Sequence, residues 1–205
     1  MIVWREYQRP RPLAQGWGGE EEVHSWAPSD QSCYTRAMDA TAAPLAGLTV
    51  LELGQIYNGP YCALLLAHHG ADVIKIESPQ GDVLRRMDRS PGGASYPFLM
   101  LNANKKGVTI NLKHERGREL FLQLTEHADI VVENFAAGVM ERLGLAYDVL
   151  AAINPRIVVA SINGVGPDGP YANRRVYDAV LQAITGRADL KSGDIGEPTI
   201  INTLV

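Results

Sequence analysis

The segment Gly47–Glu77, GLTVLELGQIYNGPYCALLLAHHGADVIKIE, constrains the fold more than any other part of the chain. A short apolar run, Leu48–Leu53, is followed by a loop and by an apolar helical pattern, Tyr61–His69, that a glycine ends. A second apolar run, Val73–Ile76, comes next. Strand, helix and strand in this order form a βαβ unit, which requires a parallel sheet. Because ligands of such sheets bind beyond the carboxyl ends of the strands, the loop Gly54–Pro60 is the first candidate site.

Strands and helices alternate in the same way through the rest of the chain. Further apolar runs predict strands at Val108–Leu112, Asp129–Glu133 and Arg156–Ile162. Helical patterns predict helices at Phe98–Asn102, Glu115–Ala128, Gly138–Leu143, Tyr147–Ile153 and Tyr177–Thr185. The strands are nearly continuous in apolar residues, which is typical of a sheet covered on both faces. The sequence therefore predicts an α/β protein with a doubly wound, mostly parallel sheet.

Residues 1–43 differ from the rest of the chain and are predicted to form a separate N-terminal extension. All three tryptophans lie here, among several prolines and glycines, and no sustained helical or strand period is present. The segment also lacks the apolar core of a signal peptide. We expect a disordered or loosely packed extension, or a wrongly assigned start with translation beginning at Met38. The domain itself is expected to span residues 44–205.

The composition argues against several classes of protein. A net charge of -4 and a pI near 5.7 do not suit a nucleic-acid-binding protein, and no apolar run approaches the roughly 18 residues that span a membrane. The two cysteines, Cys33 and Cys62, form no CxxC pair, so a reducing cytoplasm is expected. No metal site is expected, because adjacent His68 and His69 diverge on a helix and suit favourable charges at its C-terminus better.

Polar side chains follow the predicted strands at their carboxyl ends, although the chain has neither a GxGxxG nor a Walker motif. They are Gln55, Tyr57 and Asn58, then Glu77 and Ser78, then Asn111 and Lys113, then Asn134 with Phe135, and Arg142 one short helix later. Singly these residues could be structural: Asn134 could cap a helix, and Arg142 could be a solvated charge. Together they converge on one edge. Six cations could give this edge a positive field suited to a phosphorylated ligand: Lys105, Lys106, Lys113, Arg142, Arg174 and Arg175.

Six segments, in order over residues 44–205, resemble the class III CoA-transferases, the family of formyl-CoA:oxalate and carnitine CoA-transferases. They are PLAGLTVLELG, GPYCALLLAHHGADVIKIE, LNANKKGVTINLK, ADIVVENFAAGVMERLGL, NPRIVVASINGVGPDGPY and YDAVLQAITG. The resemblance implies a Rossmann-like large domain that binds CoA within an interlocked homodimer. It also implies that the small domain and the C-terminal part of the large domain are absent from this chain.

The resemblance implies CoA contacts at particular positions of this chain. These are Gln55, Ile56, Tyr57, Asn58, Ser78, Ile110, Asn111, Leu112, Lys113, Asn134, Phe135, Ala136, Arg142, Arg174, Arg175, Val176 and Tyr177. Ser78 replaces an arginine of the oxalate enzyme, and Tyr57 replaces a glutamine near its catalytic group. Both departures argue against an oxalate-type substrate.

The family chemistry exchanges one thioester for another through a nucleophilic aspartate, with an acyl-CoA and a carboxylic acid as substrates. The matching position falls about two residues beyond Val205, so we expect a truncated form that lacks the nucleophile. Tyr57, Tyr177 and Asp178 are supporting candidates, although Asp178 could equally cap a helix or lie on the surface. One alternative is an α-methylacyl-CoA racemase, whose histidine base would be replaced here by Tyr177. A non-catalytic CoA-binding fragment is the other.

Overall fold

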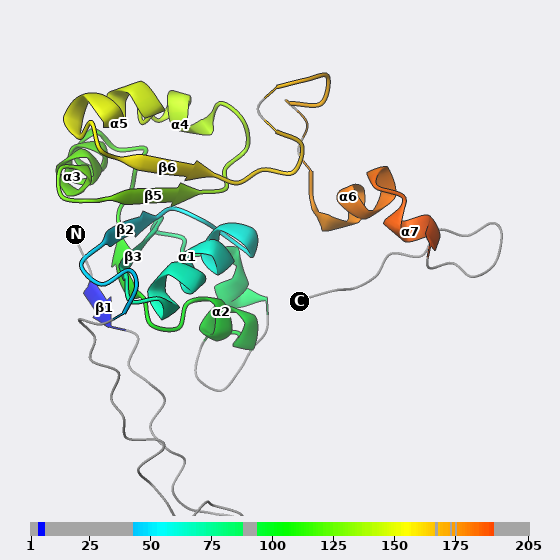
Figure 1. The fold of residues 1–205 in the computed structure, drawn as a ribbon, viewed down its shortest axis with the longest axis horizontal. Helices are drawn as coiled ribbons and strands as arrows, with labels where there is room; N and C mark the ends of the chain where they lie inside the picture. Colours follow the sequence, from blue (N-terminus) through cyan, green and yellow to red (C-terminus); the bar gives the residue numbers. More distant parts are fainter. Residues whose placement is uncertain are drawn as a thin grey trace, which may run out of the picture.

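A single mixed sheet forms the centre of the described structure (Figure 1). The computed structural model describes residues 4–6, 43–87, 94–166, 168–172, 174 and 176–190. The strands of the sheet, in spatial order, are β1 (Trp4–Glu6), β4 (Lys106–Thr109), β3 (Asp72–Glu77), β2 (Thr49–Glu52), β5 (Ile130–Glu133) and β6 (Val158–Ser161). The strands β2 to β6 are parallel, and β1 pairs antiparallel with β4.

Helices cover both faces of the sheet (Figure 1). One face carries α1 (Asn58–His68), whose Ala63 and Ala67 pack against Val50, Val73 and Val132. The small alanines let this helix approach the strands closely. Next to α1 lies α2 (Tyr96–Leu101), and the 3₁₀ helix η3 (Val83–Arg86) lies next to α2.

The other face carries three helices, α3 (Glu115–Thr125), α4 (Val139–Arg142) and α5 (Tyr147–Ile153). Their fully buried Phe121 and Leu150 join Leu51 and Val131 from the central strands in one core. Because Val50 and Leu51 face opposite layers, the central strand is apolar on both sides, as a doubly wound sheet requires.

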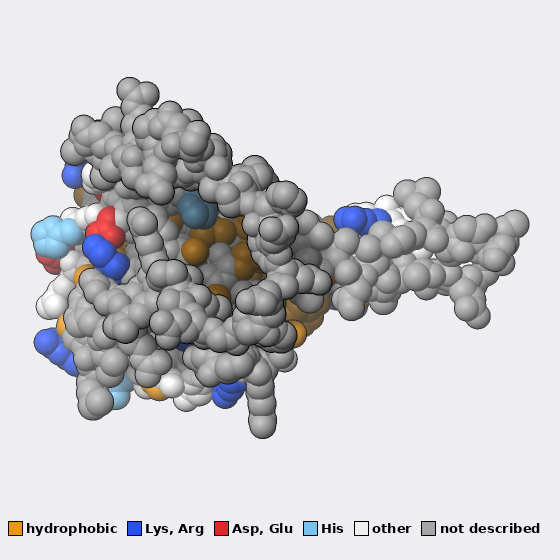
Figure 2. All heavy atoms as spheres, turned by 90° about the horizontal axis from the view of Figure 1, so that it is seen from below, with side chains coloured by type: hydrophobic (Ala, Val, Ile, Leu, Met, Phe, Trp, Pro, Cys, Tyr) orange, Lys and Arg blue, Asp and Glu red, His pale blue; other side chains and the backbone are white. Residues whose placement is uncertain are grey.

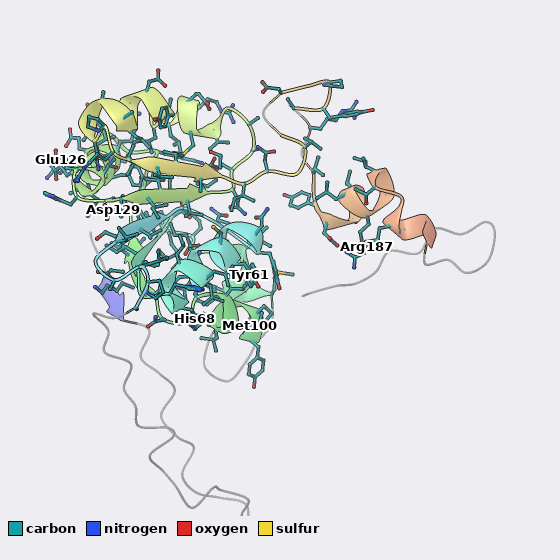
Figure 3. The ribbon with its side chains drawn as sticks, viewed as in Figure 1. Tyr61, His68, Met100, Glu126, Asp129 and Arg187 are labelled. Atoms are coloured by element: carbon teal, nitrogen blue, oxygen red, sulfur yellow. The ribbon has the colours of Figure 1, made fainter. Side chains whose placement is uncertain are left out.

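Two further helices, α6 (Asp178–Ile184) and α7 (Arg187–Leu190), lie beyond the carboxyl ends of β5 and β6 (Figure 1). Arg187, labelled in Figure 3, marks this outlying part, whereas Asp129 lies at the amino end of β5. The two ends of the sheet are therefore easily distinguished, and the candidate site is at the carboxyl end.

The predicted α/β fold and its five parallel strands are confirmed, with small differences in their ends. The first helix begins at Asn58, three residues earlier than predicted. Pro60 lies in its first turn, where a missing N–H breaks no helical hydrogen bond. Strand β4 ends at Thr109, so the predicted strand residues up to Leu112 belong to the connection that follows it.

Strand β1 lies within the segment predicted to be a loosely packed extension. It pairs Trp4 with Val108, Arg5 with Gly107 and Glu6 with Lys106. The other residues before position 43 lie outside the described residues, as does the C-terminal run Thr199–Val205. The division of the chain into 1–43 and 44–205 stays a prediction.

Candidate functional site

The loop between β2 and α1 lies at the topological switch point of the sheet. From β2 the chain proceeds to β3 and β4 on one side, and β5 then pairs with the opposite edge of β2. The connections after β2 and β5 therefore diverge, and ligands of open parallel sheets bind in the crevice between such connections. The structure brings Gln55–Asn58 and Asn134 together at this point.

The side-chain amide of Asn134 fastens the first loop to the end of β5. Its Oδ1 accepts a hydrogen bond from the Gln55 N–H at 2.8 Å, and its Nδ2 donates to the Gln55 carbonyl at 2.7 Å and to Asn58 Oδ1. The two ends of the loop also lie close together, because Gly54 and Gly59 have no side chains: a Cβ on Gly59 would lie 2.9 Å from the Cα of Gly54. Asn134 thus holds the loop, and its contact with CoA stays a prediction.

Ile56 takes a left-handed backbone conformation in this loop, with φ of 65°. Residues branched at Cβ rarely do so, because the side chain then meets the neighbouring carbonyl oxygen. The Ile56 N–H donates to Asp82 Oδ1 at 3.3 Å, and the same oxygen accepts the Leu84 N–H at 3.0 Å. A side chain from the connection after β3 therefore holds the loop after β2.

Four fully buried charged side chains, the buried charge cluster, lie beneath this loop: Glu52, Lys75, Asp82 and Lys105. Glu52 and Lys75 are directly opposite on β2 and β3, with Lys75 Nζ 3.0 Å from Glu52 Oε1. Lys105 Nζ lies 2.8 Å from Glu52 Oε2. Asp82 Oδ2 has an ionic contact of 3.2 Å with Lys75 Nζ in place of a hydrogen bond. Two positive and two negative charges balance, as burial of charge requires.

The two lysines of the buried charge cluster also bind both ends of the first loop. Lys75 Nζ donates to the Gly54 carbonyl at 2.9 Å, and Lys105 Nζ donates to the Pro60 carbonyl at 2.7 Å. Lys105 reaches Asn102 Oδ1 as well, at 3.2 Å. Burial lowers the pKa of Lys105 to about 8, although the Glu52 carboxylate acts in the opposite direction.

Sequence reasoning missed this cluster and wrongly placed one of its members, Lys105, and the adjacent Lys106 among the cations of the site. Lys105 does not contribute a surface field, because its side chain is buried against Glu52. Lys106 pairs with Asp72 at 2.7 Å at the amino ends of β4 and β3, on the edge opposite the site. The available signal was the single charged residue inside each apolar strand of the first βαβ unit, Glu52 and Lys75.

Besides Lys106, three of the six predicted cations are exposed: Lys113, Arg142 and Arg174. The sixth, Arg175, lies outside the described residues. Among the described residues visible in Figure 2, Lys and Arg side chains lie scattered and do not form one continuous patch.

Of the CoA-contacting residues predicted in the connection after β4, two pack against the core and two are exposed. Ile110 is buried in the core, and its N–H donates to the Glu77 carbonyl at 2.9 Å. Leu112 packs against the same core, whereas Asn111 and Lys113 are exposed. The Asn111 side chain accepts the Lys113 N–H at 3.1 Å and so shapes the turn.

Glu77, at the end of β3, is occupied within the protein. Its Oε1 accepts hydrogen bonds from the Arg85 Nε at 2.8 Å and from the Asp82 N–H at 2.9 Å. Arg85 also lies over the Phe98 ring, 3.9 Å from its centroid. Burial raises the pKa of Glu77, and the Asp82 N–H opposes this shift. The pair links β3 to η3 and α2.

The remaining predicted residues lie around the same end of the sheet. Ser78 and Phe135 are half-buried, and Ala136 is exposed. Tyr57 stacks on Tyr61 with ring centroids 6.2 Å apart, and Tyr61 is exposed on α1 (Figure 3).

Three predicted residues lie at the start of α6. Tyr177 precedes the helix and is 66 % exposed, and Val176 before it is half-buried. Asp178 Oδ2 accepts a hydrogen bond from Gln182 within α6. The structure therefore shows Asp178 hydrogen-bonded within its own helix, and a supporting role of Asp178 in catalysis stays a prediction.

A doubly wound α/β domain with a candidate ligand loop at the switch point is the class defined by this fold and site. The profile of CoA-transferase family III matches residues 45–205, and the chain belongs to this family.

Relatives agree with this assignment. A formyl-CoA:oxalate CoA-transferase of Streptomyces coelicolor is 43% identical over 159 residues, which cover 77% of this chain and 38% of the relative. An acyl-CoA transferase of Fusarium pseudograminearum is 36% identical over 204 residues, covering 95% of this chain and 44% of the relative. This second alignment extends into the N-terminal segment.

A solved structure has the same fold. The CAIB/BAIF family protein from Brucella suis has a TM-score of 0.74 and 40% identity, covering 78% of this chain and 44% of that chain. The chain thus spans about two fifths of the length of these relatives.

None of the described helices has the length and apolar character needed to cross a membrane. No group of three or more His, Cys, Asp or Glu residues suited to a metal ion occurs in the described ranges.

Proposed function

We propose that this chain binds CoA at the carboxyl end of its sheet as part of an enzyme that transfers CoA between carboxylic acids. The observation that carries the proposal is the fixed loop Gln55–Asn58 at the switch point, in a chain of CoA-transferase family III. The open edge above β2 and β5 is where a nucleotide-like ligand binds in such sheets.

The exposed cations would contact the phosphates of CoA. Lys113, Arg142 and Arg174 are solvent-accessible, and Arg175 is next to Arg174 in sequence. Arginine and lysine bind phosphate oxygens through charge-assisted hydrogen bonds. The loop Gln55–Asn58 would lie nearer the thioester, with Ser78, Asn111, Leu112, Asn134, Phe135 and Ala136 around it.

The proposed reaction needs no ATP, because one thioester is exchanged for another. An aspartate carboxylate attacks the acyl-CoA carbonyl, the C–S bond breaks, and a mixed anhydride forms with release of CoA thiolate. The thiolate then attacks the aspartyl carbonyl, which releases the donor acid and leaves an enzyme–CoA thioester. The acceptor acid reverses these steps. This aspartate is expected about two residues beyond Val205.

The substrates are proposed to be an acyl-CoA and a carboxylic acid other than oxalate. Relatives carry the names formyl-CoA:oxalate CoA-transferase, acyl-CoA transferase and succinyl-CoA–L-malate CoA-transferase beta subunit. Ser78 and Tyr57 depart from the oxalate enzyme, as the sequence resemblance indicates. A homodimer is proposed for the complete protein. A racemase is not favoured, because these relatives are named as CoA-transferases.

Titration calorimetry with coenzyme A tests the binding part of this proposal. We expect measurable affinity for the 205-residue chain, with Lys113→Ala and Arg142→Ala each weakening binding by about three- to tenfold. Lys106→Ala is the matched control, because Lys106 lies at the amino edge and pairs with Asp72. Absence of CoA binding by the folded chain would refute the proposal, and so would an equal loss in the control.

A further inference from the structure

Asp82 has contacts with the first loop that its place in the sequence does not suggest. It follows β3 and is 1% exposed. Its Oδ1 accepts a hydrogen bond from the N–H of Ile56, which lies 26 positions earlier in the chain. The residue is not among the predicted CoA contacts. We propose that Asp82 is a positioning residue: its carboxylate holds Ile56 in the left-handed conformation that presents Gln55–Asn58 to the ligand.

The need for such support comes from Ile56 itself. Two described residues other than glycine have positive φ, Ile56 at 65° and Asn104 at 61°. Asparagine tolerates this conformation, whereas it is unfavourable for a residue branched at Cβ. Such strain persists only where surrounding contacts determine the backbone. Asp82 Oδ1 and the Asn134 amide supply those contacts at Ile56 and Gln55.

The carboxylate of Asp82 is well suited to this role because both its oxygens are held. Oδ1 accepts two backbone N–H groups, from Ile56 and Leu84, and Oδ2 faces Lys75 Nζ at 3.2 Å. A charged acceptor makes stronger hydrogen bonds than a neutral one, and solvent and salt screen a buried group little. Lys75 is itself fixed by Glu52, so the support extends into the centre of the sheet.

The claim about loop conformation is independent of the ligand, whereas the claim about binding rests on the proposed function. Amide hydrogen exchange followed by NMR tests the first. In the unsubstituted chain, we expect the Ile56 amide to exchange at least about tenfold more slowly than an unbonded exposed amide. Asp82→Ala should abolish this protection. Asp72→Ala, which removes an exposed carboxylate at the other end of β3, should leave it unchanged.

Coenzyme A affinity tests the second claim through a double-mutant cycle. Asp82→Ala should raise the dissociation constant about tenfold while the remaining amides stay protected. In the Ile56→Gly background the same change should cost less than about threefold, because glycine needs no support at positive φ. In the Asn104→Gly background the loss should remain about tenfold.

The outcomes separate the two claims. If the unsubstituted chain does not bind coenzyme A, the proposed function fails, while Ile56 exchange still decides whether Asp82 positions the loop. Rapid exchange at Ile56 in the unsubstituted chain overturns the positioning role, even if Asp82→Ala fails to fold. An equal loss of affinity with and without Ile56→Gly also overturns it, since Asp82 would then act only on overall stability.

Discussion

At the scale of single residues, burying the charge cluster costs free energy of desolvation but fixes the conformation of the first loop. Removing charges from water is expensive, and mutual pairing of Glu52, Lys75, Asp82 and Lys105 offsets that expense. A cluster of apolar residues would be at least as stabilising in many proteins. Here the lysines also donate to the carbonyls at both ends of the first loop, which apolar side chains could not do.

The lowered pKa of Lys105 leads us to predict an unusual dependence of stability on pH. Because burial lowers its pKa to about 8, the folded protein loses this proton at a lower pH than the unfolded chain, whose lysine titrates near 10.5. Between these values the unfolded chain binds more protons, so the contribution of Lys105 to stability rises with pH. Urea unfolding of the chain and of Lys105→Met at several pH values measures it.

The difference in unfolding free energy, unsubstituted chain minus Lys105→Met, should increase above about pH 8, by at most about 1.4 kcal/mol per pH unit. Below about pH 7 it should be constant. Using a difference removes the general effect of alkaline pH, which both proteins share. A difference that falls with rising pH would contradict the assigned environment of Lys105.

The buried charge cluster also shows where sequence reasoning reaches its limit. Glu52 and Lys75 interrupt apolar strands, a signal that is visible in the sequence, but their partnership depends on strand register. Lys105 and Lys106 are neighbours in sequence, yet one is buried beneath the loop and the other pairs at the opposite edge. Whether such a residue is buried or exposed is decided by tertiary packing, which the local sequence pattern does not show.

At the scale of elements, hydrophobic periodicity predicted the βαβ unit and the alternation well. Long apolar strands and patterned helices such as Glu115–Thr125 are specified by their own sequence. Their ends are less well specified, because capping and loop contacts decide them. The prediction extended the first strand to Leu53, whereas β2 ends at Glu52, and the next residue but one, Gly54, is held by Lys75.

The packing of α3 on the sheet predicts a strong effect at Gly117. A Cβ at this position would lie 2.0 Å from the Asn111 carbonyl oxygen. Alanine favours a helix by about 1 kcal/mol over glycine, but the clash should outweigh this. Gly117→Ala should therefore lower the unfolding free energy by about 1–3 kcal/mol in urea.

Glu119→Ala provides a control on the same helix. Its carboxylate makes an exposed ion pair with Arg116, so its loss should change stability by less than about 1 kcal/mol. A Gly117→Ala variant as stable as the unsubstituted chain would show that α3 does not approach the connection after β4 this closely.

At the scale of the whole molecule, the topology places the candidate site before any side chain is considered. The reversal of strand order at β2 separates the connections after β2 and β5, and the first loop lies where they diverge. The chain spans about two fifths of its relatives' length, so the transferase activity and the homodimer are proposed for it and not inferred from their names. Binding of CoA at the carboxyl edge is its central claim.

Mapping of amide chemical shifts during titration with coenzyme A tests this claim most directly. We predict that the largest changes occur at Gln55–Asn58, Asn111–Lys113 and Asn134–Ala136, at the carboxyl ends of β2, β4 and β5. Amides at the amino ends, including Asp72 and Lys106, should change little. Saturable changes confined to the amino edge, or none at all at the first loop, would contradict the account.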